Sequence, residues 1–159
     1  MLKLRKNKKG FTLVELIVVI AIMAVLAGTV AGVTVSQLNK SKNDTAASEI
    51  KNLLNDFETF LASYDTSEID DATKAGTAVG AFNTEKKAAK GITTDILVAK
   101  TAGQAAGIKA GAGQYAYAVT YTAAVTTGTT APAKLTLTIW CDKVGSTGAN
   151  PSATRTYEI

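Results

Sequence analysis

The chain has 159 residues, of which 19% are charged, with one cysteine and no histidine. This length suits one domain with a modest core. Without histidine a serine–histidine–aspartate triad cannot be built, and the usual nitrogen and sulfur ligands of zinc are nearly missing. The lone Cys141 cannot form an intrachain disulfide. We therefore expect no enzymatic activity and no cofactor.

The net charge of +4 comes from the N-terminal segment. Five of the 17 basic residues lie in the first nine positions, and the chain beyond residue 10 carries 12 basic against 13 acidic residues. The high isoelectric point therefore belongs to residues 1–10 and does not indicate a nucleic-acid-binding body. We expect residues 1–10 to form a leader that is separate from the folded chain.

An uncharged run of 20 residues follows, from Leu16 to Val35. As an α-helix it would be about 30 Å long, enough to cross the hydrocarbon core of a bilayer. Basic residues that precede a membrane helix stay on the cytoplasmic side. We therefore expect residues 11–35 to form a single membrane-spanning helix, with the N-terminus inside and the rest of the chain outside.

Residues 36–64 carry an amphipathic helical pattern. Apolar residues recur there every three or four positions, as on one face of a helix: Ala46, Ala47, Ile50, Leu53, Leu54, Phe57, Phe60, Leu61 and Tyr64. No proline lies between Phe11 and Tyr64. We predict one long helix, apolar all round in its first half and buried on one face in its second.

Residues 65–159 read as a small globular domain. Residues 65–114 are rich in glycine, alanine and threonine, and we predict an irregular connection there with short helical pieces at 85–90 and 95–100. From Tyr115 the apolar residues alternate, which is typical of strands: YAYAVTYTAAV, KLTLTIWC and, at the end, TRTYEI. The fold class is α+β, with the long helix packed on a small antiparallel sheet.

Three tyrosines, Tyr115, Tyr117 and Tyr121, fall on one face of the first strand. They could form an adhesive surface, but aromatic residues in this pattern are more often core or subunit-contact residues. Cys141 continues the apolar face of the second strand and is most simply a small buried hydrophobe.

Residues 8–20 read KKGFTLVELIVVI. This segment strongly resembles the processing and assembly motif of type IV prepilins and the related pseudopilins, and the ten-residue leader and the phenylalanine look like the type IVa subclass. The resemblance implies that a membrane prepilin peptidase cuts between Gly10 and Phe11 and that Phe11 becomes N-methylated. It is specific over about residues 1–35 and architectural beyond them.

Glu15 stands at the head of the apolar run, where a carboxylate is costly unless it finds a partner. No lysine or arginine follows before Lys40, which is too far along the helix to pair with it. Cleavage before Phe11 would create a free amine four residues away, which is one helical turn, so a contact within the same chain is possible. In the family the glutamate pairs with the amine of a neighbouring subunit, and such a pair acts as a register device because losing either partner is penalised.

The resemblance implies a structural protein, the major subunit of a type IV pilus, with adhesion, twitching motility and aggregation as the usual outputs. Expected partners are further copies in a helical filament, the prepilin peptidase, an assembly platform with its ATPase, and membrane lipid before assembly. The alternative is a pseudopilin of a type II secretion or competence (DNA-uptake) system. An anchored binding module, or a signal peptide cut at small residues near 27–32, would leave Gly10 and Glu15 without a role.

Two glycines interrupt the apolar run, Gly28 and Gly32. Gly32 stands where many pilins have a proline and where their helix melts in the filament. Glycine costs about 1 kcal/mol against alanine in a helix, so the pair could loosen the helix. It could equally form a small-xxx-small surface for close helix packing.

Two clusters of charged residues are weaker candidates for binding sites. Four carboxylates follow the long helix, and such groups can ligate calcium, although their spacing fits no EF-hand and a solvated loop is the simpler interpretation: Asp65, Glu68, Asp70 and Asp71. Lys86, Lys87 and Lys90 form a basic patch without interleaved aromatic residues, so we favour a solvated helix face and expect no nucleic-acid partner.

Overall fold

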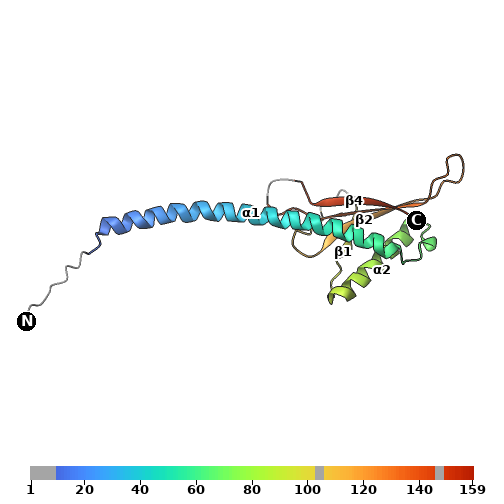
Figure 1. Ribbon diagram of the computed structural model, residues 1–159, viewed down its shortest axis with the longest axis horizontal. Coiled ribbons are helices and arrows are strands. Elements are labelled where there is room, and N and C mark those ends of the chain that lie inside the picture. Colours follow the sequence, from blue (N-terminus) through green and yellow to red (C-terminus); the bar gives the residue numbers. More distant parts are fainter. Residues whose placement is uncertain (1–9, 103–105, 146–148) are drawn as a thin grey trace, which may run out of the picture. The chain divides into compact units, whose positions relative to one another are not determined.

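The computed structural model describes residues 10–102, 106–145 and 149–159 (Figure 1). Its elements, in chain order, are α1 (Leu13–Leu61), the 3-10 turn η1 (Thr66–Glu68), α2 (Ala72–Lys90), β1 (Leu97–Ala99), β2 (Tyr115–Thr122), β3 (Lys134–Trp140) and β4 (Ser152–Glu158). The contacts between residues group the chain into two compact units, with the boundary between Leu38 and Asn39. We call the part before this division the N-terminal unit and Asn39–Ile159 the globular unit, and describe each by itself.

In the N-terminal unit every described residue, from Gly10 to Leu38, is exposed. Residues from Leu13 onward are helical, and α1 is long and apolar enough to cross a membrane by length and composition. The predicted leader falls on residues 1–10, of which all but Gly10 lie outside the described residues.

In the globular unit α1 buries the predicted apolar stripe. The buried residues are Ala46, Ile50, Leu53, Leu54, Phe57 and Leu61, and Phe60 and Tyr64 pack against them while partly exposed. The spacing of three and four residues places these side chains on one face, as the amphipathic pattern predicts. This face lies on the core that α1 shares with α2 and the sheet.

The sheet has the strand order β1-β2-β3-β4. Strands β2, β3 and β4 are antiparallel neighbours, with Val119 opposite Leu137 and Leu137 opposite Arg155, so the predicted alternating strands are confirmed. Strand β1 runs parallel to β2, with Leu97 opposite Tyr115. The predicted α+β arrangement of a long helix on a small sheet is confirmed, but the sheet is mixed, because β1 adds a parallel strand to the predicted antiparallel ones.

Helix α2 corrects the prediction of an irregular connection over residues 65–114. Asp71 caps its start, because its carboxylate accepts from Lys74 N at 2.8 Å. Gly91 ends it in the left-handed region at φ 64°, and Ile92 N donates to Lys87 O at 3.1 Å, as in a Schellman motif. The helical piece expected at 85–90 is the last part of this 19-residue helix.

The helical piece expected at 95–100 is wrong, because this segment contains β1. Strand β1 is at the edge of the sheet and pairs with β2 on one side only. On its other side, the buried side chain of Asn83, on α2, bonds the backbone in place of a neighbouring strand. Its Oδ1 accepts from Ile96 N at 2.9 Å and Leu97 N at 3.1 Å, and its Nδ2 donates to Leu97 O at 3.0 Å. A partner outside the segment therefore selects the extended conformation over the helix.

Replacing Asn83 by alanine is expected to lower the free energy of unfolding of the globular unit by about 3 kcal/mol, since buried N–H and C=O groups of β1 would lose their partners. The chain's one tryptophan, Trp140, is buried at 6% exposure, so its fluorescence during urea unfolding measures this. The exposed Asn52 on α1 provides the matched control, and equal midpoints for Asn83→Ala and Asn52→Ala would contradict the role of Asn83.

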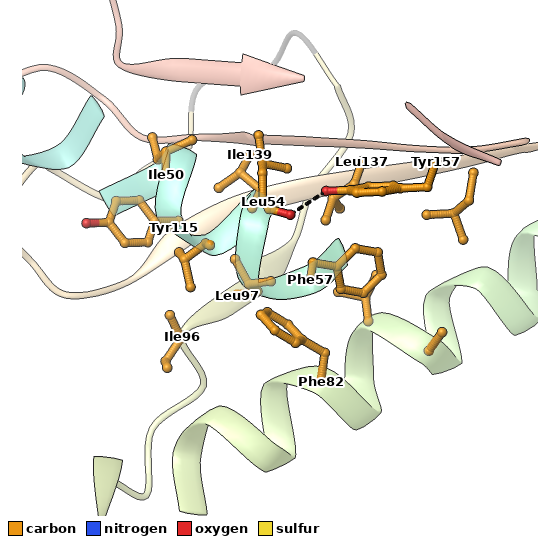
Figure 2. Packing of buried hydrophobic residues seen from close by; sticks show 14 of the residues in the cluster. Ile50, Leu54, Phe57, Phe82, Ile96, Leu97, Tyr115, Leu137, Ile139 and Tyr157 are labelled. Atoms are coloured by element: carbon orange, nitrogen blue, oxygen red, sulfur yellow. Dashed lines mark hydrogen bonds between the residues drawn. The ribbon is translucent and has the colours of Figure 1, made fainter. Parts of the chain in front are cut away.

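The core is centred on Phe57, which is fully buried. Its ring lies 5.2 Å from that of Phe82 on α2 and 5.4 Å from that of Tyr157 on β4, both edge-on. Figure 2 shows Phe82 pointing from α2 toward Phe57, with Leu137 and Tyr157 coming from the sheet. The Tyr157 hydroxyl donates to Leu54 O at 2.8 Å, which ties the last strand to α1.

The inward face of β2 belongs to this core and not to an adhesive surface. Tyr115 is buried at 2% exposure, while Tyr117 and Tyr121 are partly buried and pack against the cluster. Cys141 is fully buried, as expected of a small hydrophobe, and this burial raises the pKa of its thiol to about 11. The thiol is therefore neutral and poorly nucleophilic at physiological pH.

Candidate processing and assembly site

The chain leading into α1 is exposed and not helical. Gly10, Phe11 and Thr12 precede the first helical residue, Leu13, and Phe11 is 86% exposed. The Gly10–Phe11 peptide bond, the predicted cleavage point, thus lies in irregular backbone three residues before the helix. A bond in this position is not locked in the hydrogen bonds of α1.

Thr12 and Glu15 form a capping box at the start of α1. The Thr12 hydroxyl accepts from Glu15 N at 3.3 Å, and Glu15 Oε2 accepts from both Thr12 N and the Thr12 hydroxyl at 2.8 Å. These bonds satisfy backbone donors that the first helical turn leaves open. Thr12 was not among the predicted site residues, although the T-x-x-E spacing before an apolar run indicates a capping box.

Apolar side chains surround the Glu15 carboxylate along the helix. Leu13, Val14, Leu16 and Ile17 are all more than half exposed. Within the described residues no lysine or arginine forms an ion pair with Glu15. Among the described residues, the hydrogen bonds of this carboxylate go to Thr12, at the start of a helix whose first half is apolar on every side.

Residues 5–31 match the family described as the prokaryotic N-terminal methylation motif. This match, a signature of type IV pilins, supports a type IV pilin-like protein. The matched segment contains Gly10, Phe11, Thr12 and Glu15, so the family motif and the geometry described above fall on the same residues. No curated protein and no solved structure matches the chain.

The motif implies that the protein is a substrate of prepilin peptidase and that the processed protein assembles into a pilus-like polymer. Type IV pilins and pseudopilins form a structural, non-enzymatic family. The exposed apolar helix suits a membrane-anchored precursor. The matched residues do not distinguish a major pilin from a pseudopilin.

Gly28 and Gly32 lie within the continuous helix α1, and a Cβ added at either position would meet nothing within 4 Å. The nearby hydroxyls of Thr29 and Thr34 donate to the helix's own carbonyl groups, Leu26 O and Val30 O, both at 2.9 Å. Gly28 and Gly32 are one helical turn apart, and neither has a side chain that covers the helix backbone. Loosening and close packing both stay predictions.

The acidic residues after α1 serve mainly as local caps and ion-pair partners. Asp65 Oδ1 accepts from Ser67 N at 3.1 Å at the start of η1, Asp71 caps α2, and Asp70 pairs with Lys74 at 2.7 Å. No cluster of three or more possible metal ligands occurs among the residues that the structure describes. The geometry favours the solvated interpretation of Asp65, Glu68, Asp70 and Asp71.

Two of the three lysines in the α2 patch are paired. Lys86 lies 2.8 Å from Asp56 on α1, and Lys87 lies 2.6 Å from Asp95. Lys86 also lies over the ring of Phe82, with its Nζ 5.5 Å from the ring centroid. These contacts tie α2 to its neighbours and leave little free charge for a nucleic-acid backbone.

Proposed function

We propose that this chain is the precursor of the major subunit of a type IV pilus. A prepilin peptidase cleaves it between Gly10 and Phe11, and Phe11 then becomes N-methylated. The subunit waits in the cytoplasmic membrane, with residues 11–35 in the bilayer and the globular unit outside. An assembly platform and its ATPase add it to a filament, which serves adhesion, motility or aggregation.

The observation that carries the proposal is the placement of Glu15. Its carboxylate lies at the start of the exposed, apolar first half of α1, and its hydrogen bonds in the described chain go to Thr12. Burying a carboxylate in such surroundings is costly without an opposite charge. Cleavage before Phe11 supplies that charge, because it creates an amine on the adjacent turn and on every other copy.

Assembly follows from the exposed apolar surface of α1. Large apolar side chains such as Ile20, Met23 and Leu26 are more than half exposed. In the membrane, lipid covers these side chains, and in a filament the helices of neighbouring copies replace the lipid. The matching of each Glu15 with a Phe11 amine then sets the register in which a new copy docks.

The N-terminus of the subunit in sheared surface filaments tests the proposal. We expect intact-mass measurement and N-terminal sequencing to give a chain that begins with N-methylated Phe11, since the cut follows Gly10. A chain that begins at Met1 would overturn the cleavage, and one that begins near Ala31 would indicate an ordinary signal peptide.

Filament length distinguishes the alternative of a pseudopilin, which also begins at methylated Phe11. Long surface filaments that consist mainly of this chain support the pilus subunit. A processed chain that remains in the cell envelope, without surface filaments under conditions that express the assembly platform, would favour the pseudopilin of a secretion or DNA-uptake system.

A further inference from the structure

The globular unit begins to bury α1 at its first residues. Asn39 and Asn43 are half-buried, and Ala46 is the first fully buried residue of the helix, at 1% exposure. Gly145, whose φ of 88° is in the left-handed region, approaches Asn39 so closely that an added Cβ would lie 3.3 Å from Asn39 Nδ2. The segment after β3 therefore lies directly against this part of α1.

Asn43 bonds this segment at both amide atoms. Its Nδ2 donates to Val144 O at 3.0 Å, and its Oδ1 accepts from Val144 N at 2.9 Å. The side chain thereby occupies both main-chain groups of Val144, as a neighbouring strand would. Among the side-chain hydrogen bonds of the described α1 residues, these are the first along the helix that reach a segment outside α1.

The segment that receives Asn43 is itself held in place. Cys141 N donates to Pro151 O at 3.0 Å, and Asp142 N donates to Ile108 O at 2.7 Å. The Asp142 carboxylate accepts from Ala106 N at 3.0 Å and Gly107 N at 2.8 Å. Val144 therefore follows a fixed segment, and a bond to it fixes the helix as well.

The helix before Asn43 is held only by packing, as of Asn39 beside Gly145, because no described side-chain hydrogen bond joins residues 36–42 to another segment. Residues 36–42 read SQLNKSK, and all of them except Asn39 are exposed. Serine and asparagine are only middling helix formers. Such a stretch depends mainly on its own backbone hydrogen bonds and on the packing of Asn39, and stretches of this kind open locally at low cost.

We propose that Asn43 is a clamp that sets the point at which α1 becomes a fixed part of the globular unit. Local unwinding or bending in residues 36–42 stops at Asn43, because continuing it would break both bonds to Val144. Without the clamp, the first fixed point moves one turn onward to Ala46. The clamp acts in the unassembled chain and is independent of the proposed function.

Hydrogen exchange of the full chain in detergent micelles, followed by mass spectrometry, tests the clamp. In Asn43→Ala we expect the amides of residues 39–45 to exchange at least about tenfold faster, since two hydrogen bonds are lost. The amides of residues 53–57, in the buried part of α1, should exchange at the wild-type rate. Asn43→Asp keeps the acceptor but loses the donor and should give an intermediate rate.

The exposed Asn52, on the same helix, provides the control, and Asn52→Ala should leave residues 39–45 unchanged. Wild-type exchange of residues 39–45 in both Asn43 variants would overturn the clamp. Equal acceleration of residues 39–45 and 53–57 would also overturn it, because it would show a general loss of stability. Trp140 fluorescence shows whether each variant is folded, and Asn43→Asp carries the test if Asn43→Ala does not fold.

Discussion

Filament growth is expected to fall at least about a hundredfold when Glu15 is replaced by glutamine, while cleavage between Gly10 and Phe11 continues. Removing one partner of a buried ion pair costs about 3–5 kcal/mol, because the other charge stays buried without compensation. Each 1.4 kcal/mol corresponds to about a factor of ten. In the variant the Phe11 amine would be that uncompensated charge, and the register of docking would be lost.

The measurement compares two quantities in the same cells: the mass of the processed subunit in the membrane, and the amount of subunit in sheared filaments. Glu15→Asp is the matched control, since it keeps the charge on a shorter side chain and should restore part of the growth. Normal piliation of Glu15→Gln would contradict the pairing. Loss of cleavage in that variant would show that Glu15 acts in recognition by the peptidase instead.

The Phe57→Ala variant is expected to lose about 3–5 kcal/mol of the free energy of unfolding of the globular unit. Phe57 is fully buried and contacts the rings of Phe60, Phe82 and Tyr157, so its removal leaves a cavity where α1, α2 and the sheet meet. Large-to-small changes at such positions cost this much because the surroundings relax only partly.

Urea unfolding of the full chain in detergent, followed by Trp140 fluorescence, measures this loss. Thr59→Ala is the control on the same helix, because Thr59 is exposed and its hydroxyl bonds only Asn55 O of its own helix. We expect that change to stay within about 0.5 kcal/mol. A loss below about 1 kcal/mol in Phe57→Ala would show that the three elements do not depend on this ring.

The course of α1 and of the three antiparallel strands was predictable because their signals repeat over short distances. Apolar residues three and four apart defined the buried face around Phe57, and alternation defined the inward faces of β2 and β3. Helix α2 also carried signals that were not used. Asp71 at its start, Gly91 at its end, and the small apolar face of Ala75, Val79 and Phe82 would have found it.

Strand β1 could not be predicted in this way. Its three residues are too few to show a period, and the extended conformation depends on Asn83 and on pairing with Tyr115. The burial of Tyr117 and Tyr121 was likewise undecided in the sequence. Alternation shows which residues share a face, but only the packed elements show whether that face is covered.

The sequence by itself determined the N-terminal methylation motif, which contains Gly10, Phe11 and Glu15, and the uncharged run behind it. Their relation needs only a few neighbouring residues and the rise of a helix, so no distant partner had to be known. Only the tertiary structure decided where α1 is fixed to the globular unit. Asn43 and Val144 are 101 positions apart, and no local pattern links an asparagine on a helix to a backbone that folds against it.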